Sequence, residues 1–169
     1  ISKGATIGEV TKSLASNSEA INIEALPSTR AALPFESLRE KALSIKDKTG
    51  SLPKIFFANM GPLKQHKGRA DFSRGFFEVG GFDVINPDGF QSTEDAAKAA
   101  VESGAKAVVI CSTDDTYPEL VPGVVKGIKD VNPDTTVILA GYPKDQVEAH
   151  KASGVDEFIF LGADAYKIL

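Results

Sequence analysis

The stretch Lys54–Met60 reads KIFFANM and is apolar almost without interruption. Four further apolar runs follow it: Asp83–Asn86 (DVIN), Ala107–Cys111 (AVVIC), Thr136–Ala140 (TVILA) and Glu157–Leu161 (EFIFL). Short runs that are apolar without alternation are typical of strands buried on both faces of a parallel sheet. The sequence therefore predicts five parallel strands.

Amphipathic segments separate these runs. Ser92 and Asp95 have the spacing of a capping box, which predicts a helix start. Two other segments carry apolar residues at helical spacing, around Phe72–Val79 and Leu120–Val131. Glycines that precede the strands predict left-handed helix ends at Gly81, Gly104 and Gly154. Strands alternating with helices predict a doubly wound α/β domain, whose ligand-facing loops lie at the carboxyl ends of the strands.

Residues 1–50 follow a different pattern. We predict a short helix over Thr6–Leu14, an extended stretch over Ile21–Leu26, and an amphipathic helix that begins at Pro34 and ends at Gly50. These residues can be a tether to a preceding domain or an ordinary N-terminal extension. Because the first residue is Ile1, we favour the tether and expect the folded domain to cover residues 51–169.

The composition narrows the class of protein. A net charge of -4 and a pI of about 5.2 argue against nucleic acid as the main partner. The single Cys111 excludes an internal disulfide and fits a reducing compartment, so we expect a cytoplasmic protein. No apolar run approaches the roughly 20 residues that span a bilayer, so a membrane is not an expected partner.

The expected loop after the first strand, Gly61–Arg69, is basic and contains His66. One interpretation is a metal-binding or anion-binding loop at a helix N-terminus. The other, which we favour, is a solvated basic turn. His66 has no carboxylate or second ligand near it in the sequence, and Lys64 and Lys67 flank it.

The expected loop after the third strand is Cys111-Ser112-Thr113-Asp114-Asp115. Its hydroxyls and carboxylates can bind a metal or a ligand, but such residues also form turns and helix caps. We favour capping, by Asp115 or Thr116, of a helix that begins near Tyr117. We interpret Cys111 as a small core residue and expect His150 at the surface of a helix. The sequence contains no GK[ST] phosphate loop, GxGxxG or CxxC motif.

At these loops the sequence resembles the C-terminal domain of methylmalonyl-CoA mutases, over roughly residues 24–169. The resemblance implies a flavodoxin-like (Rossmann-like) fold of the cobalamin-binding type. A leader, Leu26–Glu40, is similar to the segment that precedes this domain in small subunits. The most specific matching pieces are Phe57–Phe77 (FANMGPLKQHKGRADFSRGFF), Gly81–Thr93 (GFDVINPDGFQST), Cys111–Pro122 (CSTDDTYPELVP) and Gly154–Gly162 (GVDEFIFLG).

Cobalamin sites of that family use a D-x-H-x-x-G loop, in which the histidine coordinates cobalt and the aspartate orients it. Aligned on its histidine, the motif falls on Lys64, His66 and Arg69. Lys64 cannot accept the imidazole N–H, and Arg69 carries a long side chain where the backbone should be bare. Other positions implied to touch the cofactor also depart from the family pattern: Cys111, Ser112 and Thr113 replace S-x-L, Gly141 retains one of two glycines, and Gly162 is shifted.

The resemblance implies a degenerate small subunit that binds no cofactor itself and is not catalytic alone. Its partner would be the large subunit, which binds adenosylcobalamin and interconverts methylmalonyl-CoA and succinyl-CoA. Two alternatives remain open: a cobalamin-binding domain with His66 as cobalt ligand, and an anion or small-molecule binding module that uses Lys64–Arg69. If side chains fill the pocket, the candidates are Lys64, Gln65, Arg69 and Tyr142.

Overall fold

The computed structural model describes residues 4–15, 24–26 and 29–169, which divide into two compact units, Ile1–Arg30 and Ala31–Leu169. The first unit contains the helix α1 (Ile7–Ala15), which confirms the predicted short helix. Thr6 and Glu9 cap it reciprocally, because each side chain accepts a hydrogen bond from the other's backbone N–H. Most of the predicted extended stretch over Ile21–Leu26 lies outside the described residues.

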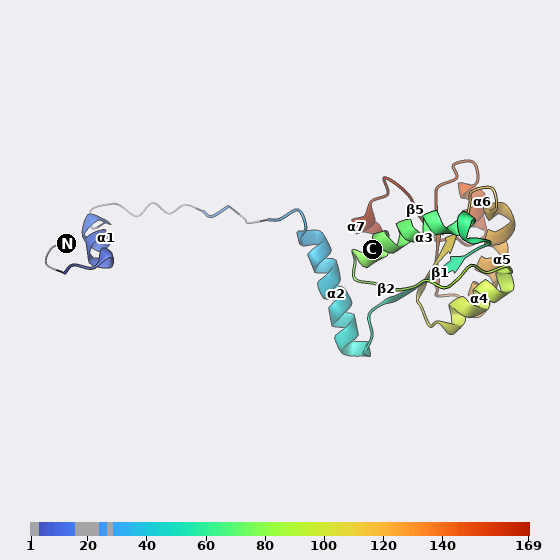
Figure 1. Ribbon diagram of the computed structural model, residues 1–169, viewed down its shortest axis with the longest axis horizontal. Helices are drawn as coiled ribbons and strands as arrows, with labels where there is room; N and C mark the ends of the chain where they lie inside the picture. Colours follow the sequence, from blue (N-terminus) through green and yellow to red (C-terminus); the bar gives the residue numbers. More distant parts are fainter. Residues whose placement is uncertain (1–3, 16–23, 27–28) are drawn as a thin grey trace. The chain divides into compact units, whose positions relative to one another are not determined.

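The second unit is built on a five-stranded parallel sheet with the strand order β2-β1-β3-β4-β5. Figure 1 shows the helices of this unit packed around the sheet. This arrangement confirms the predicted fold class. The order reverses between β1 and β3, so the loops after these two strands diverge at the carboxyl edge. The strands are β1 (Lys54–Asn59), β2 (Asp83–Ile85), β3 (Ala107–Cys111), β4 (Thr136–Ala140) and β5 (Glu157–Ile159).

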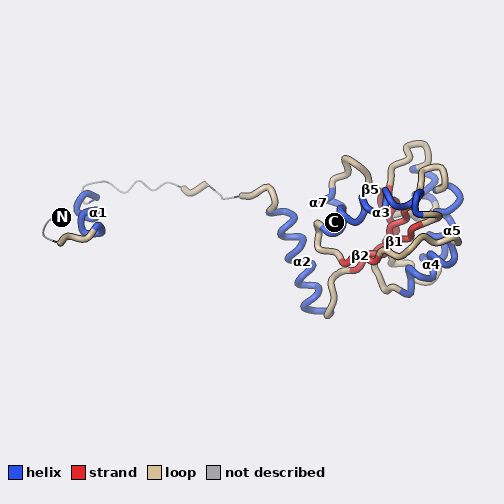
Figure 2. Tube along the Cα trace, in the orientation of Figure 1, coloured by secondary structure: helices blue, strands red, loops and turns tan. Residues whose placement is uncertain are grey.

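Helices cover both faces of the sheet (Figure 2). Successive side chains of β1 point to opposite faces of the sheet and so belong to two different cores. Ile55 and Phe57 pack beneath α3, whereas Phe56 and Ala58 face α4 and α5. The helices of this unit are α2 (Leu33–Thr49), α3 (Leu63–Glu78), α4 (Thr93–Glu102), α5 (Tyr117–Lys129), α6 (Val147–Ala152) and α7 (Ala165–Ile168).

The predicted helix ends are confirmed in detail. Ser92 accepts a hydrogen bond from the backbone N–H of Asp95 at 3.1 Å and so caps α4. Gly81, Gly104 and Gly154 have φ angles of 85°, 68° and 99°, the left-handed conformation that glycine adopts without strain. α2 ends at a left-handed Gly50, as predicted, and its Ala42 packs against Gly81, which joins this helix to the unit that contains the sheet.

Two predictions about burial were wrong. His150 is 2% exposed rather than at the surface, because the face of α6 that carries it and Val147 packs against the core. Val131, the last residue of the apolar segment Leu120–Val131 that was expected to face the core, is 67% exposed, because α5 ends at Lys129 and the helical spacing no longer applies beyond that residue. In the part of the chain that the structure describes, no helix has the length and apolar character needed to cross a bilayer.

Candidate functional site

The connection between β1 and α3 is much shorter than expected. Gly61 turns the chain with a φ of 74°, Pro62 is the N-cap residue in an extended conformation, and α3 begins at Leu63. The prediction of a loop over Gly61–Arg69 was therefore wrong beyond Pro62. Its basic residues lie on the first two turns of a helix, where residues one apart point about 100° apart.

Residues of α3 divide into three stripes around the helix axis. The buried stripe faces the sheet and consists of His66, Ala70, Ser73 and Phe77. On one side of this stripe, the helix contributes residues to a cleft at the point where the strand order reverses. On the other side, it contributes residues to a pocket beside the segment that follows β2. Neighbours in the sequence can therefore belong to different sites: Gln65 contributes to the cleft, whereas His66 and Lys67 contribute to the pocket.

We call the first hollow the switch cleft. It has a volume of about 620 Å³ and lies where ligands bind in doubly wound folds. Helix α3, the loop after β3 and the two residues that follow β5 all contribute to it. Its lining residues are Lys64, Gln65, Gly68, Arg69, Phe72, Ser112, Thr113, Asp114, Asp115, Phe160 and Leu161.

An ion pair crosses the switch cleft. Arg69 Nη2 donates a hydrogen bond to Asp114 Oδ1 at 2.9 Å, and the two side chains are 34% and 46% exposed. The same guanidinium lies over Gly141, where an added Cβ would be 3.1 Å from Arg69 Nη1. The Arg69 side chain thus occupies the space above the carboxyl end of β4.

The hydroxyls after β3 bond to one another rather than to a helix end. Thr116 Oγ1 donates to the carbonyl oxygen of Thr113 at 2.9 Å and lies 2.8 Å from Ser112 Oγ. Thr116 is at the N-cap position of α5, but its side chain makes no capping hydrogen bond. The prediction of a side-chain cap from Thr116 was therefore wrong; the hydroxyl is already used in the turn.

Tyr117 is a structural residue of this region that the sequence did not reveal. Its hydroxyl donates to the carbonyl oxygen of Ala140 at 2.6 Å and accepts from the backbone N–H of Ser112 at 3.1 Å. Burial raises the pKa of this phenol well above its usual value. The side chain therefore joins the ends of β3 and β4 as a neutral group. The only signal in the sequence is a tyrosine at the start of an apolar helical stripe.

Cys111 ends β3 inside the core and does not open into the switch cleft. The side chain is fully buried, with Sγ 3.8 Å from Ser73 Oγ. Burial raises the pKa of the thiol to about 12, so the reactive thiolate is not formed at neutral pH. Its interpretation as a core residue is confirmed.

His66 lies away from the switch cleft. It is 4% exposed, its Nδ1 is 3.1 Å from the carbonyl oxygen of Gly61, and its ring packs against Gly89. Lys64, Arg69, Ser112 and Thr113 do come together in the cleft, with Gly141 beneath Arg69. Gly162 lies in the turn after β5 with a φ of 97°. Within the described residues, no group of three or more His, Cys, Asp or Glu could hold a metal.

The chain is similar to parts of several curated proteins. It is 32% identical over 144 residues to the methylmalonyl-CoA mutase small subunit of Streptomyces virginiae, covering 85% of this chain and 22% of that protein. For the small subunit of Porphyromonas gingivalis the identity is 30% over 148 residues, covering 88% and 23%. The chain thus spans about a fifth of the length of these relatives. No family model matches it.

Two further proteins are similar to the chain at lower sequence identity. The methylmalonyl-CoA mutase large subunit of Porphyromonas gingivalis is 28% identical over 63% of this chain and 15% of its own length. Among solved structures, a cobalamin-binding protein from Desulfitobacterium hafniense superposes with a TM-score of 0.56 at 19% identity, over 83% of this chain and 69% of its own. At that identity the likeness is one of fold alone.

Proposed function

This chain belongs to the methylmalonyl-CoA mutase small-subunit family, and we propose that it is the C-terminal domain of such a subunit, with a structural role and a degenerate cobalamin site. The observation that carries the proposal is the Arg69–Asp114 ion pair, which crosses the switch cleft above Gly141. A cofactor in that position would have to displace the guanidinium and leave the Asp114 carboxylate without its partner.

The side of α3 that each residue faces limits how the family motif D-x-H-x-x-G can be aligned with this chain. Gly68 lines the switch cleft and would serve as the motif's glycine, which puts Leu63 and Gln65 at the aspartate and histidine positions. Leu63 has no side-chain acceptor, and the amide of Gln65 lacks the imidazole nitrogen that would ligate cobalt. Alignment on His66 fails differently, because that ring is buried on another side of the helix. In neither register do the residues present fit cobalamin.

The His66 alternative therefore draws no support from the position of this residue. A ring that is 4% exposed and within hydrogen-bond distance of the Gly61 carbonyl would have to leave its packing to reach a ligand in the switch cleft. We infer no step of catalysis through this chain. In the proposed complex, adenosylcobalamin and the rearrangement that it supports belong to the large subunit.

One observation favours a second candidate, an anion-binding role for the switch cleft. Lys64 lines the cleft, and within the described residues its ammonium makes no ion pair. Phosphate and CoA-type anions are the ligands that such a cation would attract. A thermal-shift series with these anions tests the idea: a rise in Tm that is lost in Lys64→Gln supports it, and an unchanged Tm across the series contradicts it.

We propose the large subunit as the partner, in a heterodimer that this domain helps to stabilise. The similarity of the chain to both small and large subunits supports a shared architecture of the two. Mass photometry of the small subunit that carries this domain, mixed with its large subunit, tests the proposal. We expect the mass of a one-to-one complex. Two separate subunit masses at micromolar concentration would contradict it.

A further inference from the structure

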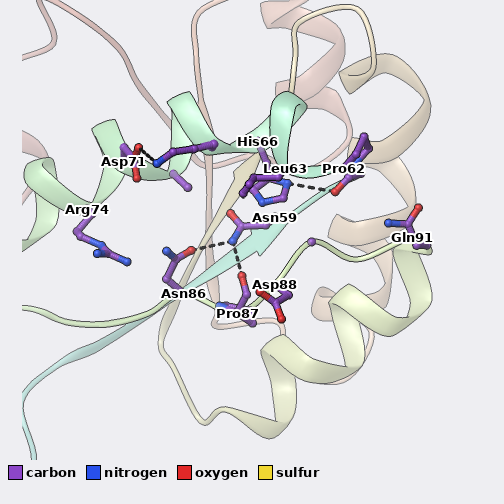
Figure 3. Close-up of a pocket in the computed structure, with 14 residues that line it drawn as sticks. Asn59, Pro62, Leu63, His66, Asp71, Arg74, Asn86, Pro87, Asp88 and Gln91 are labelled. Carbon is purple, nitrogen blue, oxygen red and sulfur yellow. Dashed lines mark hydrogen bonds and ion pairs between the residues drawn. The ribbon is translucent and has the colours of Figure 1, made fainter.

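A second hollow lies on the opposite side of α3 from the switch cleft. We call it the α3–β2 pocket, because its walls are α3 from Leu63 to Arg74 and the segment that follows β2 (Figure 3). Its volume is about 540 Å³, within the range of small-molecule sites. The residues that carry the argument are Asn59, Arg74 and Asp88, with Asn86 beside them. The cofactor site of the proposed family lies elsewhere, in the switch cleft.

The inner wall of this pocket holds a buried acceptor without a partner. Asn59 is 1% exposed, and its Nδ2 donates to Asn86 Oδ1 and to the carbonyl oxygen of Pro87, each at 2.7 Å. Because a carbonyl can only accept, the bond to Pro87 fixes which end of the amide is nitrogen. Asn59 Oδ1 is then left without a hydrogen bond among the described residues. Buried acceptors are nearly always satisfied by protein, water or ligand, so this one indicates a missing donor.

Two of the four charged side chains that line the pocket, one of each sign, form no ion pair within the described residues. Lys67 and Asp71 pair with each other at 2.6 Å. The hydrogen bond from Lys67 lowers the pKa of the Asp71 carboxyl, and the nearby Arg74 guanidinium contributes to that shift without forming an ion pair. Asp88, an exposed side chain on the opposite wall, also forms none among the described residues. A guanidinium without an ion pair, a carboxylate without an ion pair and a buried acceptor therefore line one hollow. A ligand that complements all three must carry an anionic group together with a cationic donor.

The wall after β2 is preformed. Gly89 packs so closely that an added Cβ would lie 2.6 Å from His66 Cε1 and would also meet the carbonyl oxygen of Gly61. Backbone hydrogen bonds hold the same segment to β1: Phe90 N–H donates to the Asn59 carbonyl at 2.7 Å, and Gly61 N–H donates to the Phe90 carbonyl at 2.8 Å. Because this wall is already ordered, binding of a ligand loses little conformational entropy there.

We propose that the α3–β2 pocket binds a small zwitterion of the α-amino acid class. The ligand carboxylate pairs with Arg74. Its ammonium pairs with Asp88 and donates to Asn59 Oδ1, directly or through one water. This inference does not depend on the proposed structural role, because it concerns a different set of residues on the other side of α3.

The test is a titration of the chain with L-serine, followed by calorimetry and by amide NMR shifts at Gly89 and at the Asn59 side chain. N-acetyl-L-serine removes the cationic donor, and L-serinamide removes the carboxylate. We expect saturable binding of L-serine with shifts at those amides, and binding at least about tenfold weaker for both analogues.

Three variants locate the site. Arg74→Gln and Asp88→Asn should each weaken L-serine binding on the order of tenfold. Arg69→Gln is the matched control, because its guanidinium lies in the switch cleft, and it should leave the affinity unchanged. Absence of saturable binding overturns the proposal. Equal binding of L-serine and N-acetyl-L-serine also overturns it and would indicate a plain carboxylate site. Loss of binding in Arg69→Gln alone would show that L-serine binds in the switch cleft instead, which also overturns the proposal.

Discussion

Arg69 on α3 and Asp114 in the loop after β3 form an ion pair with an N–O distance of 2.9 Å across the switch cleft. The pair joins the two segments that diverge at the reversal of strand order, where a doubly wound fold ordinarily receives its ligand. The switch cleft is therefore crossed by the protein's own side chains.

We expect the Arg69–Asp114 pair to contribute little to stability. Both side chains are about a third or more exposed, so water and salt screen the attraction. A double-mutant cycle with Arg69→Gln and Asp114→Asn, measured by urea unfolding, should give a coupling free energy of about 0.5 kcal/mol that falls with added salt. A coupling above about 2 kcal/mol would show that the pair holds the fold rather than occupying the cleft.

Gly141→Ala should destabilise the domain by about 1–3 kcal/mol. The φ of Gly141 is 145°, which side-chain-bearing residues rarely adopt, and the new methyl would crowd Arg69. Gly75→Ala is the control: this glycine lies on the exposed side of α3 with no atom within 4 Å of an added Cβ. Thermal unfolding should show a lower Tm for the first variant and a stabilisation of about 0.5–1 kcal/mol for the second. A neutral Gly141→Ala contradicts the strain argument.

Tyr117→Phe should cost about 1–3 kcal/mol, because it leaves the Ala140 carbonyl and the Ser112 N–H buried without their partner. Tyr142→Phe provides the comparison. Its side chain is 43% exposed, and among the described residues its hydroxyl makes no hydrogen bond, so the change should stay within about 0.5 kcal/mol. Equal losses in urea unfolding for the two variants would show that the Tyr117 hydroxyl does not bind the strand ends together.

His150 should make the domain less stable in mild acid. Burial lowers the pKa of its imidazole below the usual value, so the unfolded chain takes up the proton at higher pH than the folded one. The stability from neutral His150 is therefore fully present above the unfolded pKa of about 6.5 and is lost as pH falls through that value toward the folded pKa. Urea unfolding from pH 7.5 to 5 measures the slope. His150→Gln should flatten it; an unchanged slope in that variant would assign the effect to other groups.

Much of the fold could be predicted because its signals are local. The five apolar runs mark the strands within two residues at their ends, and the left-handed glycines mark where helices stop. Which residues of a short helix are buried was harder to predict than the strands and the helix ends. α6 spans only Val147–Ala152, and so short a segment shows no clear apolar stripe that would place His150 in the core.

The candidate site was only partly predictable, because the position of each residue around the axis of α3 decides which side chains line the site. Lys64 and Arg69 do line the switch cleft, but His66 falls in the buried stripe, since a shift of one residue turns a side chain by about 100°. The start of α3 decides this rotation. Gly61-Pro62, one residue after the end of β1, was the available signal, because proline favours the beginning of a helix. The partners of Arg69 and Asn59 come from distant segments, and a single sequence does not reveal them.

The proposed function is tested most directly by titrating the chain with hydroxocobalamin and adenosylcobalamin while following the visible spectrum and the heat of binding. With Arg69 across the switch cleft and Leu63 and Gln65 at the positions that should orient and ligate cobalt, we predict no saturable change up to about 1 mM cofactor. Saturable binding with a spectral shift that disappears in His66→Ala or Gln65→Ala would contradict the account and show that the switch cleft still holds cobalamin.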